Sequence, residues 1–353
     1  MTSTNVDLGF LETDYEPWEV ECRYFPSKVG GRPAWLDLKY LPSVTEMECP
    51  HCHQPRKFLL QVYAPDNEVS EAFHRTIFLF ICTTNSCWTE PARCPVLVLR
   101  SQLGRENDYY PSSAPEDGGM WRPDLVVGLH TAVCAVCGAR GDSKCGQCRA
   151  VSYCGQPHQK LDWRAGGHKA RCGQKSSQSV QVSPVSWCLK EGLLDMEEEP
   201  DRAEDTGENE KYEEMAAMVG SGSLADCEGL EEVERDQVED AVCERFRGRV
   251  RRAPGQVVRY ERGGQPLLCT SSPALEPPPA CQHCGAERSL EFQVMPQLLT
   301  ELSLGLEECP GLDWGSLYVY TCQASCPVTR GYYQEHLQIR NFDNTNLPGT
   351  DRG

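Results

Sequence analysis

The sequence predicts a mainly β or α+β protein in which two related β half-domains form one composite domain, with a small cysteine-rich finger between them. Short aromatic and β-branched runs at 58–63, 76–81 and 96–100 are typical of strands. Closely spaced cysteine pairs crowd the segment 134–172. The residue pattern of the first third of the chain also returns after residue 250. These three observations predict the architecture together.

The returning pattern keeps its order throughout, and its spacing from Cys49 to Val62 and from Cys281 to Val294. Corresponding residues are Gly30 with Gly263, Cys49 with Cys281, Cys52 with Cys284, Phe58 with Leu290, Cys82 with Cys322, and Cys87 with Cys326. Two half-sheets with exposed edges would gain stability by pairing. We therefore predict an N-terminal half at 1–115, a finger at 130–175, an acidic and largely disordered linker at 176–245, and a C-terminal half at 246–353.

The charge of the chain is concentrated in one segment. The 353 residues carry a net charge of −18, and residues 195–244 alone hold 20 acidic against three basic side chains. The rest is close to neutral and offers no broad basic surface, so nucleic acid is not an expected partner. The acidic segment either shields a basic partner or is only a solvated linker.

The role of the cysteines depends on the cellular compartment in which the protein resides. The chain has no run of eighteen apolar residues, and residues 1–10 lack the basic and apolar regions of a signal peptide. We expect no transmembrane helix, no membrane partner, and residence in the cytosol or nucleus. Because that compartment is reducing, the 21 cysteines are better interpreted as metal ligands than as disulfides.

The central segment carries eight candidate ligands in four pairs. They are Cys134, Cys137, Cys145, Cys148, Cys154, His158, His168 and Cys172. Thiolate and imidazole suit zinc, and eight such ligands supply two tetrahedral sites. About 40 residues cannot hold a core unaided, so metal is expected to hold this fold. The alternative is eight incidental residues.

Each half-domain carries a further set of four cysteines. One pair lies in a short loop before a strand, and the other pair follows a strand: Cys49, Cys52, Cys82 and Cys87 in the first half, and Cys281, Cys284, Cys322 and Cys326 in the second. We expect one zinc ion in each set, in addition to two in the finger. Buried free thiols are the alternative. His51, His53 and Cys94 are possible substitutes for a ligand of the first set.

The finger resembles the MYND family over its whole length. The matching residues include Tyr153-Cys154, Gln159, Trp163 and the spacing from His168 to Cys172. His158 departs from the pattern, because most of these fingers have Cys there. The resemblance implies that the ligand pairs interleave. One zinc would take Cys134, Cys137, Cys154 and His158, and the other Cys145, Cys148, His168 and Cys172.

The resemblance to MYND fingers also implies a groove for Pro-containing peptides. Gln159 and Trp163 are its candidate binding residues. The alternative is that Trp163 only packs the small core of the finger.

Most of the chain resembles the programmed cell death protein 2 family. The resemblance rests on Val6–Phe10, Phe25–Trp35, Phe58–Pro65, Gln256–Tyr260 and Glu291–Leu299, in this order around the finger. A departure lies at 184–194, which contains Val-Ser-Trp-Cys-Leu-Lys. The resemblance implies a nuclear and cytoplasmic protein linked to cell death and proliferation. It also implies a chaperone that captures a newly made, basic protein of the small (40S) ribosomal subunit and supports ribosome assembly.

The sequence favours one of three classes of function. A non-enzymatic zinc-binding adaptor or chaperone is the expected class. The alternative is a nuclear MYND-finger regulator of transcription or cell death that binds protein partners or DNA, although the finger lacks the long recognition helix of Cys2His2 fingers. An enzyme is not expected, because no convincing Gly-rich cofactor loop occurs and closed four-ligand zinc sites leave no position for a catalytic water.

Overall fold

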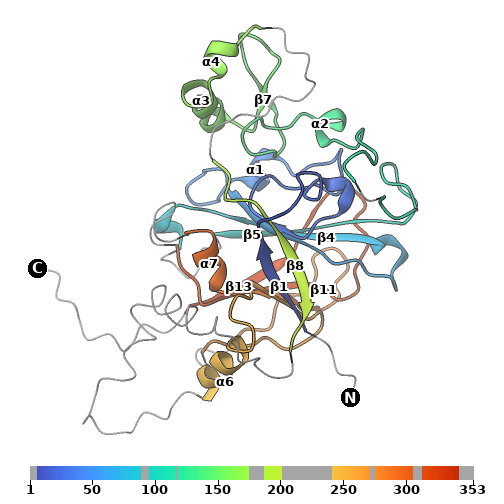
Figure 1. Cartoon of the computed structure of the whole chain (residues 1–353), viewed down its shortest axis with the longest axis vertical. Coiled ribbons are helices and arrows are strands. Elements are labelled where there is room, and N and C mark those ends of the chain that lie inside the picture. The colour runs from blue at the N-terminus through green and yellow to red at the C-terminus, as the bar shows by residue number, and fades with distance from the viewer. Residues whose placement is uncertain are drawn as a thin grey trace, which may run out of the picture.

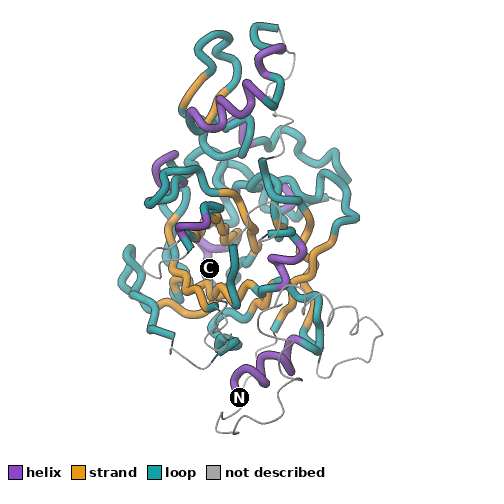
Figure 2. The backbone as a smooth tube through the Cα atoms, turned by 90° about the vertical axis from the view of Figure 1, so that its left-hand side faces the viewer, coloured by secondary structure: helices purple, strands orange, loops and turns teal. Residues whose placement is uncertain are grey.

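The main feature of the computed structural model is one antiparallel sheet of eleven strands (Figures 1 and 2). The structure describes residues 6–88, 95–116, 118–174, 187–200, 241–270, 275–304 and 312–341. The strand order is β12-β5-β4-β3-β2-β8-β1-β9-β10-β11-β13. The strands span β1 Asp7–Glu12, β2 Lys28–Val29, β3 Lys57–Tyr63, β4 His74–Ile81, β5 Val96–Leu103, β8 Gly192–Glu198, β9 Val258–Tyr260, β10 Arg288–Val294, β11 Ser316–Cys322, β12 Tyr333–Gln334 and β13 His336–Arg340.

Helices are few and short, so the fold is mainly β as predicted. In the described part of the chain they are α1 Val44–Met47, α2 Val127–His130, α3 Gln156–Arg164, α4 His168–Arg171, α6 Ala241–Val250 and α7 Gln297–Glu301, with 3-10 turns η1 Cys22–Tyr24, η2 Ser70–Ala72 and η3 Asn85–Cys87. None of the helices in the described ranges has the length and apolar character needed to cross a membrane. The predicted strands at 58–63, 76–81 and 96–100 are confirmed as β3, β4 and β5.

The two ends of the sheet come together, so that it nearly closes on itself. β12 pairs with β5 at one end, and β13 pairs with β11 at the other. Only Glu335 separates β12 from β13, and its backbone N–H donates to the Val98 carbonyl at 3.0 Å. Near closure removes most of the unpaired strand edge that an open sheet would expose.

The apolar side chains of alternate strand residues form two cores. Ile77, Leu79 and Ile81 on β4 share one cluster with Leu317 and Val319 on β11. Side chains alternate between the faces of a strand, so Phe78 and Phe80 point to the other face. There they join a second cluster that includes Trp35, Tyr110 and residues of the finger. The first core therefore joins strands of both predicted halves, and the second joins the sheet to the finger.

Strand β8 corrects the predicted linker at 176–245. Residues 192–198 form β8, which pairs with β1 on one side and β2 on the other, and 241–250 form α6. The acidic composition hid the strand, because Asp195 and Glu197 are exposed while Leu194 is buried and Met196 is half-buried, in the alternation of a strand. Residues 201–240, the main part of the expected disordered segment, lie outside the described residues.

The finger lies at the top of Figure 1 and carries its own two-stranded sheet, β6 Ser143–Lys144 with β7 Ser152–Tyr153. β7 leads directly into α3, and α4 packs beside α3. The helices and hairpin bring the spaced cysteines and histidines of this segment together.

Candidate metal centres

The inner site of the finger gathers Cys134, Cys137, Cys154 and His158, all buried. The sulfur atoms of Cys137 and Cys154 lie 3.8 Å apart. Nδ1 of His158 lies 3.5 Å from the sulfur of Cys134 and 3.0 Å from that of Cys154, so Nδ1 is the nitrogen that faces the thiols. β7 and the first turn of α3 place the last two of these residues on one side of the site.

The outer site of the finger gathers Cys145, Cys148, His168 and Cys172, two of them half-buried. The sulfurs of Cys145 and Cys172 are 3.9 Å apart, and Nε2 of His168 lies 3.6 Å from the sulfur of Cys148. The two sets have the interleaved composition that the resemblance to MYND fingers implies. Gly167, whose φ of 77° lies in the left-handed region, supplies the turn into α4 and His168.

The N-terminal half carries a third set. Cys49 and Cys52 lie in the loop before β3, Cys82 follows β4, and Cys87 ends the turn η3. Their sulfurs are 3.8 Å apart for Cys49 and Cys87, and 3.5 Å apart for Cys52 and Cys82. The group consists of these four thiols and includes neither His51 nor His53. Cys94 lies outside the described residues.

The C-terminal half carries the fourth set, whose sulfur atoms are separated by the same distances as those of the third set. The sulfurs are 3.8 Å apart for Cys281 and Cys326, and 3.5 Å apart for Cys284 and Cys322. Arg100 reaches this set from β5 in the other half of the sheet. Its guanidinium donates to the Cys326 carbonyl at 2.9 Å and lies 3.4 Å from the Cys326 sulfur, so a cation faces the thiols.

The geometry of all four sets fits zinc. In each set the ligand atoms lie within 4.8 Å of one another. Thiolates about 2.3 Å from a central zinc ion form a tetrahedron with edges of about 3.8 Å. The separations between sulfurs, from 3.5 to 3.9 Å, match those edges. Four ligands from the protein close each site, which is the arrangement of structural zinc.

The acidity of the thiols also suits a metal, because the thiolate is the form that ligates. Burial raises the pKa of Cys52, but hydrogen bonds led by the Thr84 hydroxyl outweigh it, and the pKa is about 7. In the same way backbone N–H groups overcome burial and hold the pKa of Cys145 at about 6 and that of Cys281 at about 7. The pKa of Cys134 is lowered chiefly by hydrogen bonds from Cys137 and Cys154. Each set therefore contains one acidic thiol, whereas burial raises the pKa of other thiols in the sets, for example that of Cys82 to about 11 and that of Cys326 to about 12.

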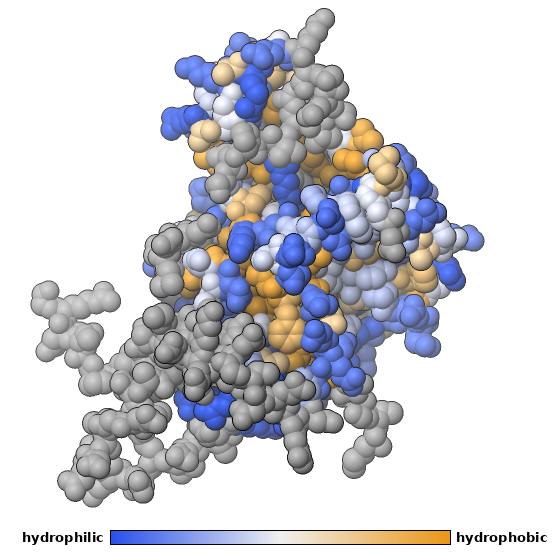
Figure 3. Space-filling view, viewed as in Figure 1, coloured by the Kyte–Doolittle hydropathy of each residue, from blue (hydrophilic) through white to orange (hydrophobic). Residues whose placement is uncertain are grey.

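Gln159 and Trp163 line one groove on the finger. Its volume is about 330 Å³, and its other lining residues are Cys145, Gly146, Gln147, Lys160 and Arg164. Trp163 is half-buried and its ring lies 5.8 Å from that of His168 in a T-shaped contact. The side chain therefore both packs against a candidate ligand and lines the groove. Lys160 and Arg164 are exposed, and much of the visible surface at the top of Figure 3, where the finger lies, is hydrophilic.

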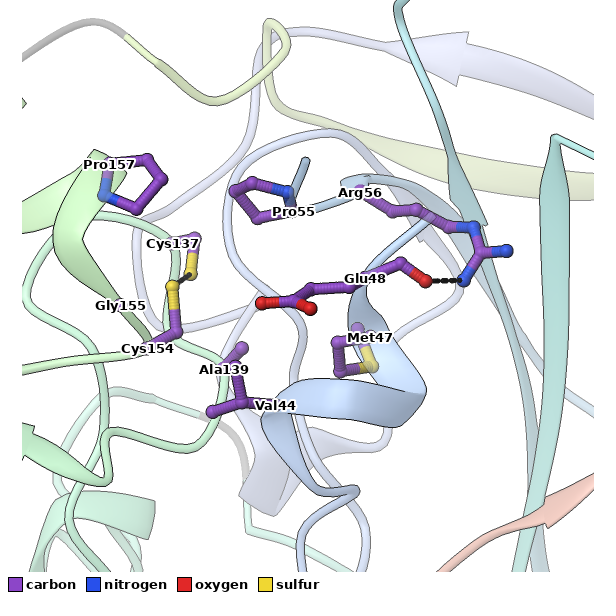
Figure 4. Close-up of a pocket in the computed structure, with 10 residues that line it drawn as sticks. All are labelled: Val44, Met47, Glu48, Pro55, Arg56, Cys137, Ala139, Cys154, Gly155 and Pro157. Carbon is purple, nitrogen blue, oxygen red and sulfur yellow. Dashed lines mark hydrogen bonds between the residues drawn. The ribbon is translucent and has the colours of Figure 1, made fainter. Parts of the chain in front are cut away.

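A junction between the finger and the sheet was not anticipated from the sequence. Figure 4 shows Val44 and Met47 of α1 facing Cys137, Cys154 and other finger residues across a narrow gap of about 20 Å³. Beside it, the Trp35 indole N–H donates to the Gly138 carbonyl at 2.8 Å, and Arg32 donates to the Ala135 carbonyl. The inner site therefore lies against the body, whereas the groove beside the outer site is lined by finger residues.

Models of known protein families match three parts of the chain. The programmed cell death protein 2 N-terminal domain matches residues 5–117, the MYND finger matches 134–172, and the programmed cell death protein 2 C-terminal putative domain matches 240–341. No solved structure matches the chain.

Curated relatives agree with these domains. Programmed cell death protein 2 of Bos taurus is 38% identical over 342 residues, covering 94% of this chain and 95% of that one. The Rattus norvegicus protein of that name is 38% identical over 357 residues, covering 96% and 97%. Probable 20S rRNA accumulation protein 4 of Schizosaccharomyces pombe is 30% identical over 112 residues, 27% of each chain. With its finger, its flanking domains and these full-length similarities, the chain belongs to the programmed cell death protein 2 family.

Proposed function

We propose that this chain is a non-enzymatic adaptor or chaperone that captures a newly made protein of the small (40S) ribosomal subunit and supports ribosome assembly, in the nucleus and the cytoplasm, with links to proliferation and apoptosis. The observation that carries the proposal is the similarity to a protein named for 20S rRNA accumulation. The acidic segment supports it, because a ribosomal protein binds RNA through basic surfaces and an acidic partner complements them.

Zinc has a structural role in this proposal. One ion is held by each of the four ligand sets, two in the finger and one in each half of the sheet. In each half of the sheet the metal joins the loop before one strand to the end of the next strand, β3 and β4 in the first half and β10 and β11 in the second. The closed four-ligand geometry gives zinc no role in catalysis here.

The two halves of the sheet are related units in the same proposal. The pairing of β3 with β4 shifts register between Phe58 and Leu60, and the pairing of β10 with β11 shifts between Leu290 and Phe292. These positions correspond in the repeat of the sequence. A bulge bends a strand and strengthens its twist, so the same irregularity at the same place supports a common origin.

Capture of the client is tested by co-expression followed by quantitative pulldown of newly made ribosomal proteins. Replacing Cys281 and Cys284 by Ser removes half of the fourth set, so we expect loss of bound zinc and of the client. Cys243→Ser, outside every ligand set, is the matched control and keeps both. A wild-type chain that enriches no ribosomal protein over background contradicts the proposal.

Deleting residues 201–240 tests the acidic segment without cutting β8, which ends at Glu198. Charges exposed to solvent attract over about 10 Å at 0.1 M salt, so the deletion should slow capture and weaken its dependence on salt. The identity of the client should not change, because acidic charge alone attracts any basic protein and does not select one. A switch of client would place selectivity in this segment instead.

A second candidate function is binding of a Pro-containing peptide by the finger. The groove that joins Gln159 to Trp163 favours it. Replacing both residues by Ala should abolish a peptide partner and leave client capture intact. A chain that shifts a DNA probe at physiological salt and captures no ribosomal protein would instead favour a nuclear regulator.

A further inference from the structure

We propose that the two metal sites of the finger have different roles: the inner site is coupled to the central strand β8 through Trp187, and the outer site serves only the finger and its groove. This inference rests on the zinc occupancy proposed above. It assigns Trp187 as a positioning residue for a metal ligand, and segment 187–191 as the physical link between the finger and the sheet.

His158 is the ligand of the inner site that contacts Trp187. Its Nδ1 faces the thiols, while its Nε2 is buried and has no hydrogen-bond partner among the described residues. A histidine that ligates a metal normally donates its other N–H to a carboxylate, a carbonyl or water, which fixes the ring. Here the ring of Trp187 lies 4.2 Å from the imidazole centroid in a T-shaped contact at 72°. An indole face accepts an N–H weakly, so Trp187 takes the place of the missing partner.

Trp187 is also contacted from the side of the sheet. The ammonium of Lys57, the first residue of β3, lies 5.6 Å from the Trp187 ring, so the indole is placed between the sheet and the finger ligand. His158 and Trp187 are both departures from the patterns that the chain otherwise resembles. The contact places an indole beside the imidazole that stands here in place of the usual thiolate.

The chain continues from Trp187 into β8 through residues that contact both the finger and the sheet. The Cys188 sulfur lies 3.6 Å from the Val136 carbonyl of the finger, between two ligands of the inner site. The Leu189 carbonyl accepts from the Gly31 N–H at 2.9 Å, next to β2. β8 begins three residues later and pairs with β1 and β2. Loss of the inner metal would therefore free one end of the segment that leads into the middle of the sheet.

Among the described residues, the outer site lacks comparable contacts with the sheet. Cys148 and Cys172 are half-buried, and Cys145 borders the groove, whose lining residues all belong to the finger. Inner-site residues Cys137 and Cys154 instead face Val44 and Met47 of the body (Figure 4). The two sites thus differ in what they touch, although their ligands interleave along the sequence.

Release of zinc from the full-length protein to a chromogenic chelator tests the role of Trp187. Trp187→Leu removes the aromatic face, so one zinc equivalent should leave about tenfold faster or more. Trp187→Phe keeps an aromatic face and should restore much of the slow release. Trp121→Leu, a tryptophan outside the finger, should match the wild type. Unchanged release from Trp187→Leu overturns the inference while leaving the proposed zinc content intact; a wild-type chain that holds no finger zinc overturns both.

Hydrogen exchange of the β8 amides tests the coupling to the sheet. Replacing Cys134 and Cys137 by Ser should increase exchange at 192–198 about tenfold or more, because β8 then opens locally more often. Replacing Cys145 and Cys148 by Ser is the matched control, since it removes a thiol pair of equal size from the outer site, and it should leave β8 protected. Equal effects of the two pairs, or no effect of the inner pair, would overturn the different roles.

Discussion

His74 is a buried histidine that lies outside every metal site. Its ring stacks on Phe25 with centroids 4.2 Å apart, and its Nδ1 is hydrogen-bonded to the Tyr63 hydroxyl at 3.0 Å. Burial disfavours the charged imidazolium and lowers the pKa of His74 to about 4. His74 therefore remains neutral in the folded protein at pH values at which an unfolded chain would already have bound a proton.

This difference predicts a dependence of stability on pH. The pKa of His74 is about 6.5 in the unfolded chain and about 4 in the folded one, so its stabilising contribution is complete above the first value and is lost as pH falls towards the second. The variant His74→Gln should lose less stability than the wild type over that range, by up to about 2 kcal/mol after allowance for solvent screening. Urea unfolding at pH 7.5 and pH 5 measures the difference. The metal ligands titrate in both proteins, so parallel losses would contradict the prediction.

At the residue scale, the sequence predicts ligands better than their partners. Cys134 and Cys137 are recognisable because their spacing is local and characteristic of zinc. The contacts of Trp187 with His158 and of Trp35 with Gly138 join segments far apart in the chain. Spacing along a sequence carries no information about such contacts, so only the folded structure reveals them.

At the scale of elements, β8 depends on close packing against β1. A Cβ atom added to Gly192 would lie 2.6 Å from a Leu11 methyl carbon and 2.8 Å from the Glu12 carbonyl oxygen. Both distances are too short for van der Waals contact, and the second atom belongs to backbone. Glycine at this position therefore allows the two central strands to lie side by side.

Gly192→Ala is expected to destabilise the protein by about 1–3 kcal/mol, the usual effect of overpacking. Gly248→Ala is the control, because a Cβ there meets nothing within 4 Å and alanine favours helix α6. Its effect should be neutral or stabilising by up to about 1 kcal/mol. Thermal or denaturant unfolding of both variants provides the measurement. Equal stability of the two variants would show that β1 and β8 adjust their spacing without strain.

Elements with a clear period were predictable, and those without one were not. β3 and β4 stand out as continuous apolar and aromatic runs. In β8 the apolar residues alternate with carboxylates that hide them, and β12 is only two residues long. The order of the strands could not be predicted from the sequence, for a different reason. Pairing of β1 with both β8 and β9 depends on contacts between segments far apart in the chain.

At the scale of the whole molecule, a buried ion pair joins the two halves of the sheet. Arg75 on β4 and Glu291 on β10 form two hydrogen bonds of 2.7 and 2.6 Å, and both side chains are completely buried. Tyr260 donates to the same carboxylate at 3.0 Å. Burial alone would raise the pKa of Glu291, but the charge and hydrogen bonds of Arg75 hold it below its ordinary value. The carboxylate is therefore charged, and it is satisfied by groups from both halves.

A double-mutant cycle on this pair tests whether the halves depend on each other. Arg75→Met leaves the buried carboxylate with only the more distant Arg262 guanidinium, 3.8 Å away, and should cost about 3–5 kcal/mol, because a poorly paired charge in the interior is poorly solvated. Glu291→Gln leaves the opposite charge and should cost a similar amount. The double variant removes both charges, so it should be more stable than the sum of the two losses predicts, with a coupling of about 1–3 kcal/mol. Equilibrium unfolding by denaturant, monitored by both fluorescence and far-UV circular dichroism, measures the free energy of unfolding of each variant. Additive losses, or separate transitions for the two halves in the wild type, would mean that the sheet is two independent units and that the ion pair does not join them.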